Sequence, residues 1–165
     1  MPIPYEALEV ALSEAVETFL RRLLQQVNYT DLYAVGLYTS GELNYLVPTA
    51  NATSAWTRSK GSKWSPADWT FHLYAIEAFK TTEKVLIQGW NEDFSTFDVD
   101  QARMRQLIHR VLLKARERYL YGSSAVVGLF MGEMGSPWVR ESVVEVNPPH
   151  VVHAFDSDLS TQWQE

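Results

Sequence analysis

The sequence contains no cysteine. This absence excludes disulfide bonds, thiolate zinc sites and cysteine nucleophiles, and it is typical of a reducing compartment. No apolar run approaches the ~20 residues that a membrane-spanning helix requires, and the first residues, MPIPYEALEV, lack the basic and apolar regions of a secretory signal. We therefore expect a cytoplasmic protein that has no membrane partner.

Basic residues are also scarce: 14 Lys and Arg stand against 20 Asp and Glu, which gives a formal net charge of −6. Nucleic acid is an improbable partner for such a chain, because phosphate contacts require cations. The charge is uneven, since six basic residues lie between Asp98 and Gly122, whereas six acidic residues and only Arg140 follow Gly132. These regions either attract each other within the fold or attract a charged partner.

The sequence signatures of the common enzyme classes are missing. The segment GLFMGEMG does not have the GxGxxG spacing of a phosphate-binding loop, and no GxSxG motif is present. His150 and His153 have a spacing compatible with metal binding, but no third ligand is suitably spaced. Adjacent acids such as Asp156 and Asp158 are usually only solubilising. We expect no catalytic residues, no metal and no cofactor.

Two long helices are predicted from the spacing of apolar residues. The first follows Pro4 and carries apolar positions at helical spacing from Leu8 to Val27. The second is predicted to begin at Asp98 or Asp100 as its N-cap, with the apolar face Met104, Leu107, Ile108, Val111, Leu112, Ala115 and Tyr119 and with Gly122 at its end.

Three strands are predicted. Leu32 to Thr39 is apolar on both faces and should be an inner strand, and a tight Ser40-Gly41 turn should lead to a second strand from Leu43 that stops at Pro48. Ala125 to Met131 reads as a buried strand in which Gly128 allows a neighbour to approach closely.

The remaining segments give shorter elements. Asn51 to Lys63 is small and polar and predicts an exposed loop. Ser65 and Pro66 should then start a helix whose buried residues are Trp69, Leu73, Ile76 and Phe79. The run from Val85 to Trp90 fits a helix or a strand, and we favour the helix. Ser136-Pro137 and Asn147-Pro148 each predict the start of a short C-terminal helix.

Together these elements predict one α+β domain over residues 1–165, in which a small antiparallel sheet is packed by helices on one side. A chain of this length buries ~70% of its unfolded surface without a metal or a covalent crosslink.

Three segments of the chain carry a family resemblance. They are LYAVGLYTSGELNYLVPTANA, KWSPADWTFHLYAIEAF and SVVEVNPPHVVHAF. Their order, from about Asp31 to Phe155, resembles the bacterial family catalogued as domain of unknown function 4303. The family supplies no established activity and no catalytic residues. Relatives of this size are often regarded as immunity proteins against contact-delivered toxins, and the resemblance implies that function here.

The family pattern also implies a working surface. If Pro48 to Asn51 closes the hairpin, Asn51 and the loop beyond it form a rim beside the sheet. The candidate binding residues of this rim are Asn51, Trp56 and Trp64, and a pocket between the sheet and the loop would add Trp69 and Glu133. The alternative is that Asn51 only ties the loop to the backbone and that the tryptophans cover the core. The sequence leaves both interpretations open.

Two functions therefore follow as hypotheses. The first is a non-enzymatic binding protein, most concretely an immunity protein that neutralises a toxin through an aromatic and acidic surface. The second is a domain for a small molecule or nucleotide, with hydrolysis as one activity, that uses a pocket between the sheet and the loop. RNA binding through the helix from Arg103 to Arg118 is a third idea, which the acidic total disfavours.

Overall fold

The computed structural model describes residues 3–59, 62–89 and 97–162. The elements in chain order are α1 (Tyr5–Gln26), β1 (Leu32–Tyr38), β2 (Val47–Ala52), α2 (Thr53–Ser59), the 3-10 turns η1 (Pro66–Asp68) and η2 (Ile76–Phe79), α3 (Lys80–Gly89), α4 (Phe97–Tyr119), β3 (Val126–Phe130), α5 (Pro137–Val146) and α6 (Pro149–Gln162). Within these ranges, no helix has the length and apolar content needed to cross a membrane.

The α+β class is confirmed, and β1 is the inner strand of a three-stranded sheet with the order β2-β1-β3. β1 pairs antiparallel with β2 but parallel with β3, so the sheet is mixed and not wholly antiparallel as expected. Parallel strands require a long connection, and here the segment between β2 and β3 contains α3 and α4. This length allows the chain to enter β3 in the same direction as β1.

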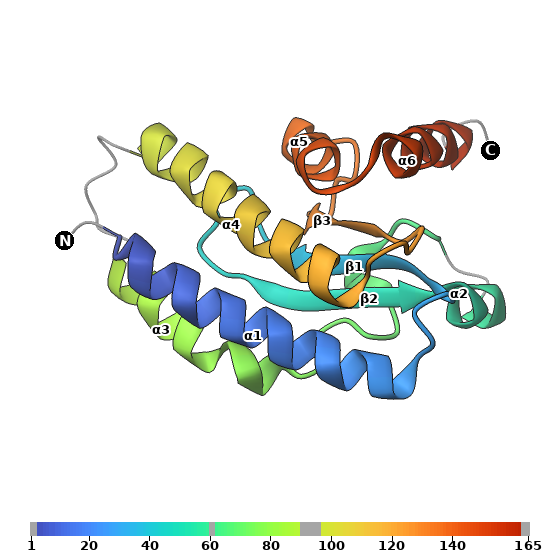
Figure 1. The fold of residues 1–165 in the computed structure, drawn as a ribbon. Coiled ribbons are helices and arrows are strands. Elements are labelled where there is room, and N and C mark those ends of the chain that lie inside the picture. The colour runs from blue at the N-terminus through green and yellow to red at the C-terminus, as the bar shows by residue number, and fades with distance from the viewer. Residues whose placement is uncertain (1–2, 60–61, 90–96, 163–165) are drawn as a thin grey trace.

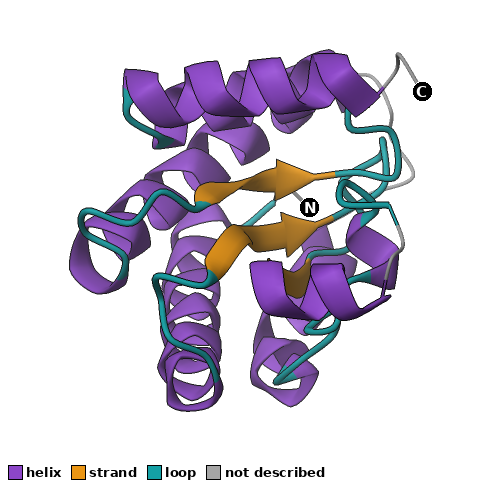
Figure 2. Ribbon diagram, turned by 90° about the vertical axis from the view of Figure 1, so that its right-hand side faces the viewer, coloured by secondary structure: helices purple, strands orange, loops and turns teal. Residues whose placement is uncertain are grey.

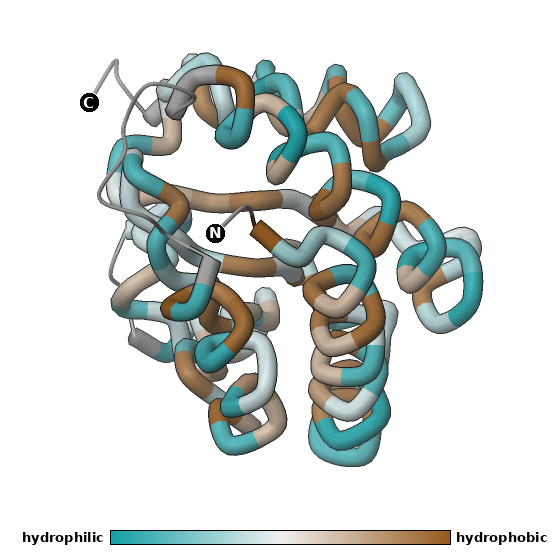
Figure 3. The backbone as a smooth tube through the Cα atoms, turned by 90° about the vertical axis from the view of Figure 1, so that its left-hand side faces the viewer, coloured by the Kyte–Doolittle hydropathy of each residue, from teal (hydrophilic) through white to brown (hydrophobic). Residues whose placement is uncertain are grey.

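Helices cover both faces of the sheet, so the expectation of helices on one side is wrong (Figures 1 and 2). One hydrophobic cluster joins α1, α3 and α4 to Val35, Leu37 and Val127 on one face. A second cluster joins α5 and α6 to Ala34 and Phe130 on the other. Figure 3 shows apolar strands between helices whose turns alternate in hydropathy, as a sheet buried on both faces requires.

The hairpin differs from its prediction. β2 begins at Val47 and contains Pro48, whereas the segment from Leu43 to Leu46 lies outside the sheet. Pro48 is tolerated because β2 is at the edge of the sheet, where a missing N–H breaks no inner pairing. The buried Leu43 instead turns the chain with a φ of 55°.

The expected loop from Asn51 to Lys63 is also wrong over its first part. Asn51 belongs to β2, and Thr53 starts the short helix α2. The carbonyl of Asp31 accepts the N–H of Thr53 at 2.8 Å, and its carboxylate accepts the N–H of Ser54 at 3.3 Å. This cap is contributed by a residue from the other end of the hairpin, so local composition did not indicate it.

The helix predicted after Ser65 is replaced by irregular turns. Ser65 makes no side-chain cap, and η1 ends at Asp68. The N–H groups of Phe71 and Leu73 then donate to the carbonyls of Ala50 and Pro48, so this segment covers the outer edge of β2. In consequence Leu73 and Ile76 are exposed, although Trp69 and Phe79 are buried as expected.

The predicted helices outside this region are confirmed, with shifted ends. α4 begins at Phe97, so Asp98 and Asp100 lie in its first turn and are not N-caps, while Gly122 follows its end with a φ of 75°. Val85 to Gly89 is helical, and Trp90 is outside the described residues. Ser136 caps α5 through a bond from the N–H of Trp138, whereas Asn147 is the C-cap of α5 and not the N-cap of the next helix.

Helix α5 closes the outer edge of β3 with two polar side chains. Ser142 Oγ accepts the N–H of Leu129 at 2.6 Å. The amide of Asn147 accepts the N–H of Val127 at 2.9 Å and donates to the carbonyl of the same residue at 2.6 Å. Asn147 thus pairs with β3 as another strand would. Gly128 allows this close packing, since a Cβ there would lie 3.0 Å from Ser142 Oγ.

The buried guanidinium of Arg116 links the same place to α4. Its Nε donates to Asn147 Oδ1 at 3.2 Å, and its other nitrogens donate to the carbonyls of Leu120, Ser123 and Ala125. Arg116 therefore ties the end of α4 to the start of β3 and to α5, with backbone carbonyls in place of a carboxylate.

We expect Asn147→Ala to lower the free energy of unfolding by about 2–4 kcal/mol, because it leaves buried groups of Val127 and Arg116 unpaired. Urea unfolding measures the change. Asn44→Ala, which alters an exposed asparagine, is the matched control and should have little effect. Equal stability of the two variants would contradict the role of Asn147.

His109 is a second buried polar group on α4. Its Nε2 finds no hydrogen-bond partner among the described residues. Burial lowers the pKa of this imidazole below its ordinary value of 6.5, although Glu141 and Glu145 oppose the shift and Arg105 adds to it. The unfolded chain therefore binds a proton at a higher pH than the folded protein, and protonation favours unfolding.

The free energy of unfolding should be at its full value above about pH 6.5 and should fall below it. His72, whose pKa is also lowered by burial, contributes in the same direction. Urea unfolding at a series of pH values should show that the free energy of unfolding falls less with acid in His109→Leu than in the wild type. His153→Leu, at an exposed position on α6, should keep the wild-type slope. If the free energy of unfolding of His109→Leu fell with acid as steeply as that of the wild type, His109 would not be the group responsible.

Candidate binding groove

A β-bulge in β1 directs Tyr33 toward the second hydrophobic cluster. Leu32 is opposite Ala52 and Ala34 is opposite Asn51, so Tyr33 is an extra residue between two paired positions. A bulge of this kind changes the face on which the following side chains lie. Tyr33 and Ala34 consequently both join the cluster on the α6 side of the sheet, while Leu32 and Val35 join the other.

Tyr33 lies at the centre of an aromatic cluster. Its ring meets Trp64 and Trp69 edge to face, with centroids 5.5 and 5.9 Å apart. Trp64 also meets Phe155 of α6 at 5.1 Å, and Trp69 meets Phe130 of β3 at 5.3 Å. Edge-to-face contacts of this kind hold buried rings in defined orientations. The cluster therefore fixes the segment 64–69 against both the sheet and α6.

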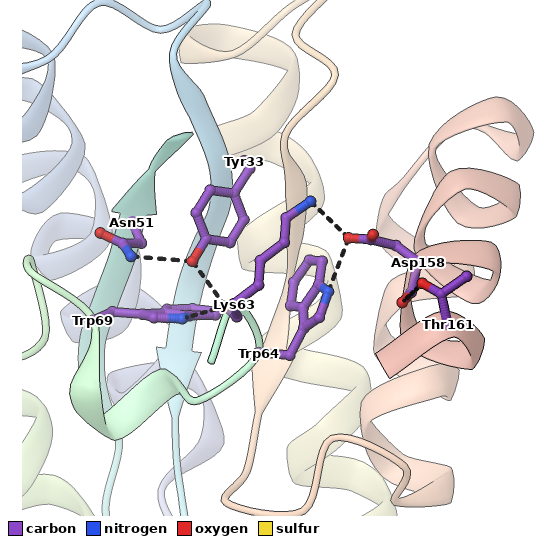
Figure 4. A network of polar contacts seen from close by, with 7 residues as sticks. All are labelled: Tyr33, Asn51, Lys63, Trp64, Trp69, Asp158 and Thr161. Atoms are coloured by element: carbon purple, nitrogen blue, oxygen red, sulfur yellow. Dashed lines mark hydrogen bonds and ion pairs between the residues drawn. The ribbon is translucent and has the colours of Figure 1, made fainter. Parts of the chain in front are cut away.

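The polar atoms of this cluster converge on one backbone carbonyl (Figure 4). The Tyr33 hydroxyl and the Trp69 indole N–H donate to the carbonyl of Lys63 at 2.7 and 2.8 Å. Asn51 Nδ2 donates to the Tyr33 hydroxyl at 3.0 Å, and Asn51 Oδ1 accepts the N–H of Thr70 at 3.3 Å. Burial raises the pKa of Tyr33 to about 12, so its hydroxyl remains a donor at neutral pH.

The ammonium of Lys63 lies among three aromatic rings. It is 5.2 Å from the ring centroid of Tyr33, 5.5 Å from that of Trp56 and 5.6 Å from that of Trp64. The carboxylate of Asp158 on α6 contacts it at 2.6 Å and also accepts the indole N–H of Trp64 at 3.0 Å. We call these three rings and the Asp158 carboxylate the Lys63 cage.

The cage borders an open groove of about 580 Å³. The groove lies between the first residues of β1 and β3 and one face of α6, and Tyr33, Lys63, Trp64 and Asp158 are part of its lining. Hydroxyl groups supply much of the remaining polar lining, from Thr30, Thr53, Ser124, Ser157 and Thr161. An aromatic wall, a charged pair and several hydroxyls equip the groove to hold a ligand by both apolar and polar contacts.

The structure brings four of the five predicted site residues together. Asn51, Trp64 and Trp69 are buried within the aromatic cluster, and half-buried Trp56 contributes to the cage. Their burial agrees with the alternative in which Asn51 ties backbone segments and Trp64 covers the core. Glu133 is exposed in the loop after β3 and does not line the groove.

Sequence reasoning missed Tyr33, Lys63 and Asp158. Tyr33 falls within the predicted inner strand, and the bulge that redirects it has no local sequence signal. Asp158 was read as solubilising, yet it pairs with Lys63 and Trp64, while Asp156 pairs with Arg140. Only the proximity of Lys63 to three tryptophans in the sequence gave a hint, and that proximity alone does not define a cage.

The basic residues of α4 and the histidine pair do not line the groove. Arg105, Arg110 and Arg118 of α4 each pair with an acidic side chain of α5 or α1. Of these three pairs, only Arg105–Glu141 joins the basic region to the acidic segment after Gly132, because Glu9 and Glu17 belong to α1. His150 and His153 are exposed on α6, and in the described part of the chain no three His, Asp or Glu side chains are grouped to hold a metal.

Comparison with known families gives one match. Residues 12–132 match the model of a domain of unknown function, DUF4303. The chain belongs to the DUF4303 family. A search of curated proteins and a search of solved structures each found no match. The match contains the first two of the three quoted segments and confirms the family, whereas the third segment, SVVEVNPPHVVHAF, lies beyond its last residue.

The DUF4303 match contains most of the site but not all of it. It includes Tyr33, Asn51, Lys63 and the tryptophans at 56, 64 and 69, whereas α5 and α6 lie beyond its last residue. In this DUF4303 chain, the carboxylate that completes the cage therefore comes from outside the matched segment.

Tyr33→Phe should lower the free energy of unfolding by about 1–3 kcal/mol, because it removes one donor from the Lys63 carbonyl and the acceptor of the Asn51 amide. Tyr121→Phe is the control, since Tyr121 is 84% exposed. Chemical denaturation compares the two variants with the wild type. A Tyr33→Phe protein as stable as Tyr121→Phe would show that these bonds contribute nothing.

Proposed function

We propose that this protein is a non-enzymatic binding protein whose groove takes up part of a protein partner. The observation that carries the proposal is the construction of the groove: preoriented aromatic rings form its wall, and a lysine–carboxylate pair and several hydroxyl groups lie at its surface. Aromatic side chains with polar tips are enriched where proteins recognise one another.

An immunity protein that neutralises a toxin by direct binding is the most concrete form of this function. The family resemblance implies it, and the net charge of −6 suits fast association with a basic partner. In this form the groove needs only to occlude the partner and performs no covalent step.

A small-molecule or nucleotide ligand, with hydrolysis as one activity, is the second candidate. It is favoured by one observation, the groove volume of about 580 Å³, which falls within the range of roughly 300–1,000 Å³ that is typical of such sites. In this case the ligand itself, and not a protein surface, would fill the groove.

The test is a groove-blocking substitution on α6. Ala154 is exposed and lines the groove, so Ala154→Arg should fill it without disturbing the core. The partner to test is the product of a neighbouring gene if that gene encodes a toxin. We expect this variant to weaken binding to it at least about tenfold in calorimetry, which corresponds to about 1.4 kcal/mol.

Ser160→Arg is the matched control, because Ser160 is exposed on α6 but does not line the groove. It adds the same charge and should bind as the wild type does. If both variants weakened partner binding equally, the added charge would explain the effect, and the proposal that the partner occupies the groove would be contradicted. A thermal-shift screen separates the second candidate: a saturable small ligand that stabilises the wild type but not Ala154→Arg, with no protein partner, would replace the first proposal.

A further inference from the structure

Lys63 is held at its backbone and at its tip by different groups. Its carbonyl accepts the Tyr33 hydroxyl and the Trp69 indole, while its ammonium lies in the Lys63 cage. The side chain between these points is 27% exposed, and that of Asp158 is 37% exposed. The ammonium therefore sits at the border between the aromatic cluster and the open groove (Figure 4).

We propose that the Lys63 cage is a recognition site for an alkylammonium group of the ligand, and that Lys63 is an internal occupant which the ligand displaces. This inference rests on the proposed binding function of the groove and names the chemical group that the groove selects.

The groups around the ammonium select a cation. Aromatic rings present negative faces, and three rings within about 6 Å of one ammonium form the kind of cage that recognises alkylated ammonium groups. Asp158 adds a formal negative charge at 2.6 Å from the ammonium. An anionic ligand would have to approach both this carboxylate and the ring faces, so the cage disfavours it.

The cage should persist when Lys63 leaves it. The rings of Tyr33 and Trp64 are held by buried edge-to-face contacts, and Asp158 stays oriented by the indole N–H of Trp64. The lysine stem has several rotatable bonds, so its ammonium can swing into solvent while the Lys63 carbonyl keeps both of its hydrogen bonds. Displacement then requires no movement of the backbone.

An internal occupant lowers the apparent affinity for an external one. If Lys63 fills the cage in about nine-tenths of the molecules, its removal should tighten ligand binding about tenfold, because the competent fraction rises from one-tenth to all. Lys63 would thus favour a cation that other contacts in the groove also hold.

The experiment compares the wild type with Lys63→Ala. Both are titrated with choline and with its uncharged isostere 3,3-dimethyl-1-butanol, and tryptophan emission and calorimetry report binding. We expect Lys63→Ala to bind choline about tenfold more tightly than the wild type, and to prefer choline clearly over the alcohol. In the Lys63→Ala background, Asp158→Asn or Trp56→Ala should abolish most of this affinity.

The wild type provides a measurement that does not depend on any variant folding. Choline should change its tryptophan emission saturably, and the alcohol should not. No saturable change in either protein, or equal binding of choline and the alcohol, would overturn the inference. Thermal unfolding of each variant shows whether a lost response reflects a lost fold.

Two further probes identify the source of the ammonium group. A peptide that contains one lysine, and the same peptide with trimethyllysine, represent a protein partner, whereas choline represents a free small cation. Preference for a peptide supports a side chain of the partner, and preference for choline supports a small ligand. Either result upholds the cage as an alkylammonium site.

The two proposals fail separately. If Ala154→Arg blocks the protein partner but no alkylammonium probe binds, the cage inference falls and the binding function stands. If Lys63→Ala binds choline but no protein partner depends on Ala154, the cage stands and the function moves to a small cationic ligand.

Discussion

The amide of Asn147 is the contact on which the second layer of this protein depends. It replaces a missing strand at the edge of β3 and receives the buried guanidinium of Arg116, so it fixes α5 to the sheet and to the end of α4. Only Asn147 and Pro148 separate α6 from α5, so the position of α6 also depends on this contact. Phe155 and Asp158 lie on α6. The wall of the groove and the carboxylate of the cage therefore depend on Asn147 for their positions, although Asn147 belongs to neither.

The site itself is assembled from distant parts of the chain. The bulge at Tyr33, Trp56 of α2 and the irregular segment from Lys63 to Trp69 supply the rings, and α6 supplies the charge that balances Lys63. Polar groups in the aromatic cluster are hydrogen-bonded to one another. Tyr33 and Trp69 donate to the Lys63 carbonyl, and Asn51 donates to the Tyr33 hydroxyl. Loss of one member would leave buried polar partners unsatisfied, so the network is sensitive to substitution at each position.

Much of the fold could be predicted from the sequence where local pattern decides the outcome. The stripe of α1, the apolar face of α4, the inner strand β1, and the Ser136-Pro137 start of α5 follow from spacing and capping chemistry. The errors occur where a distant residue decides. Asp31 starts α2, the carbonyls of β2 pull Phe71 and Leu73 out of a helix, and helices from both ends of the chain cover opposite faces of the sheet. The cage was unpredictable for the same reason, although Trp56 and Trp64 are among the candidate residues that the sequence names.

Both edges of the sheet are already occupied. The backbone of the segment around Phe71 and Leu73 bonds to β2, and the side chains of Ser142 and Asn147 bond to β3. A three-stranded sheet with open edges would invite another chain to pair with it, either as a recruited peptide strand or in aggregation. Here that route is closed along the covered positions, so any partner would have to be recognised through side chains on the surface and not through main-chain pairing.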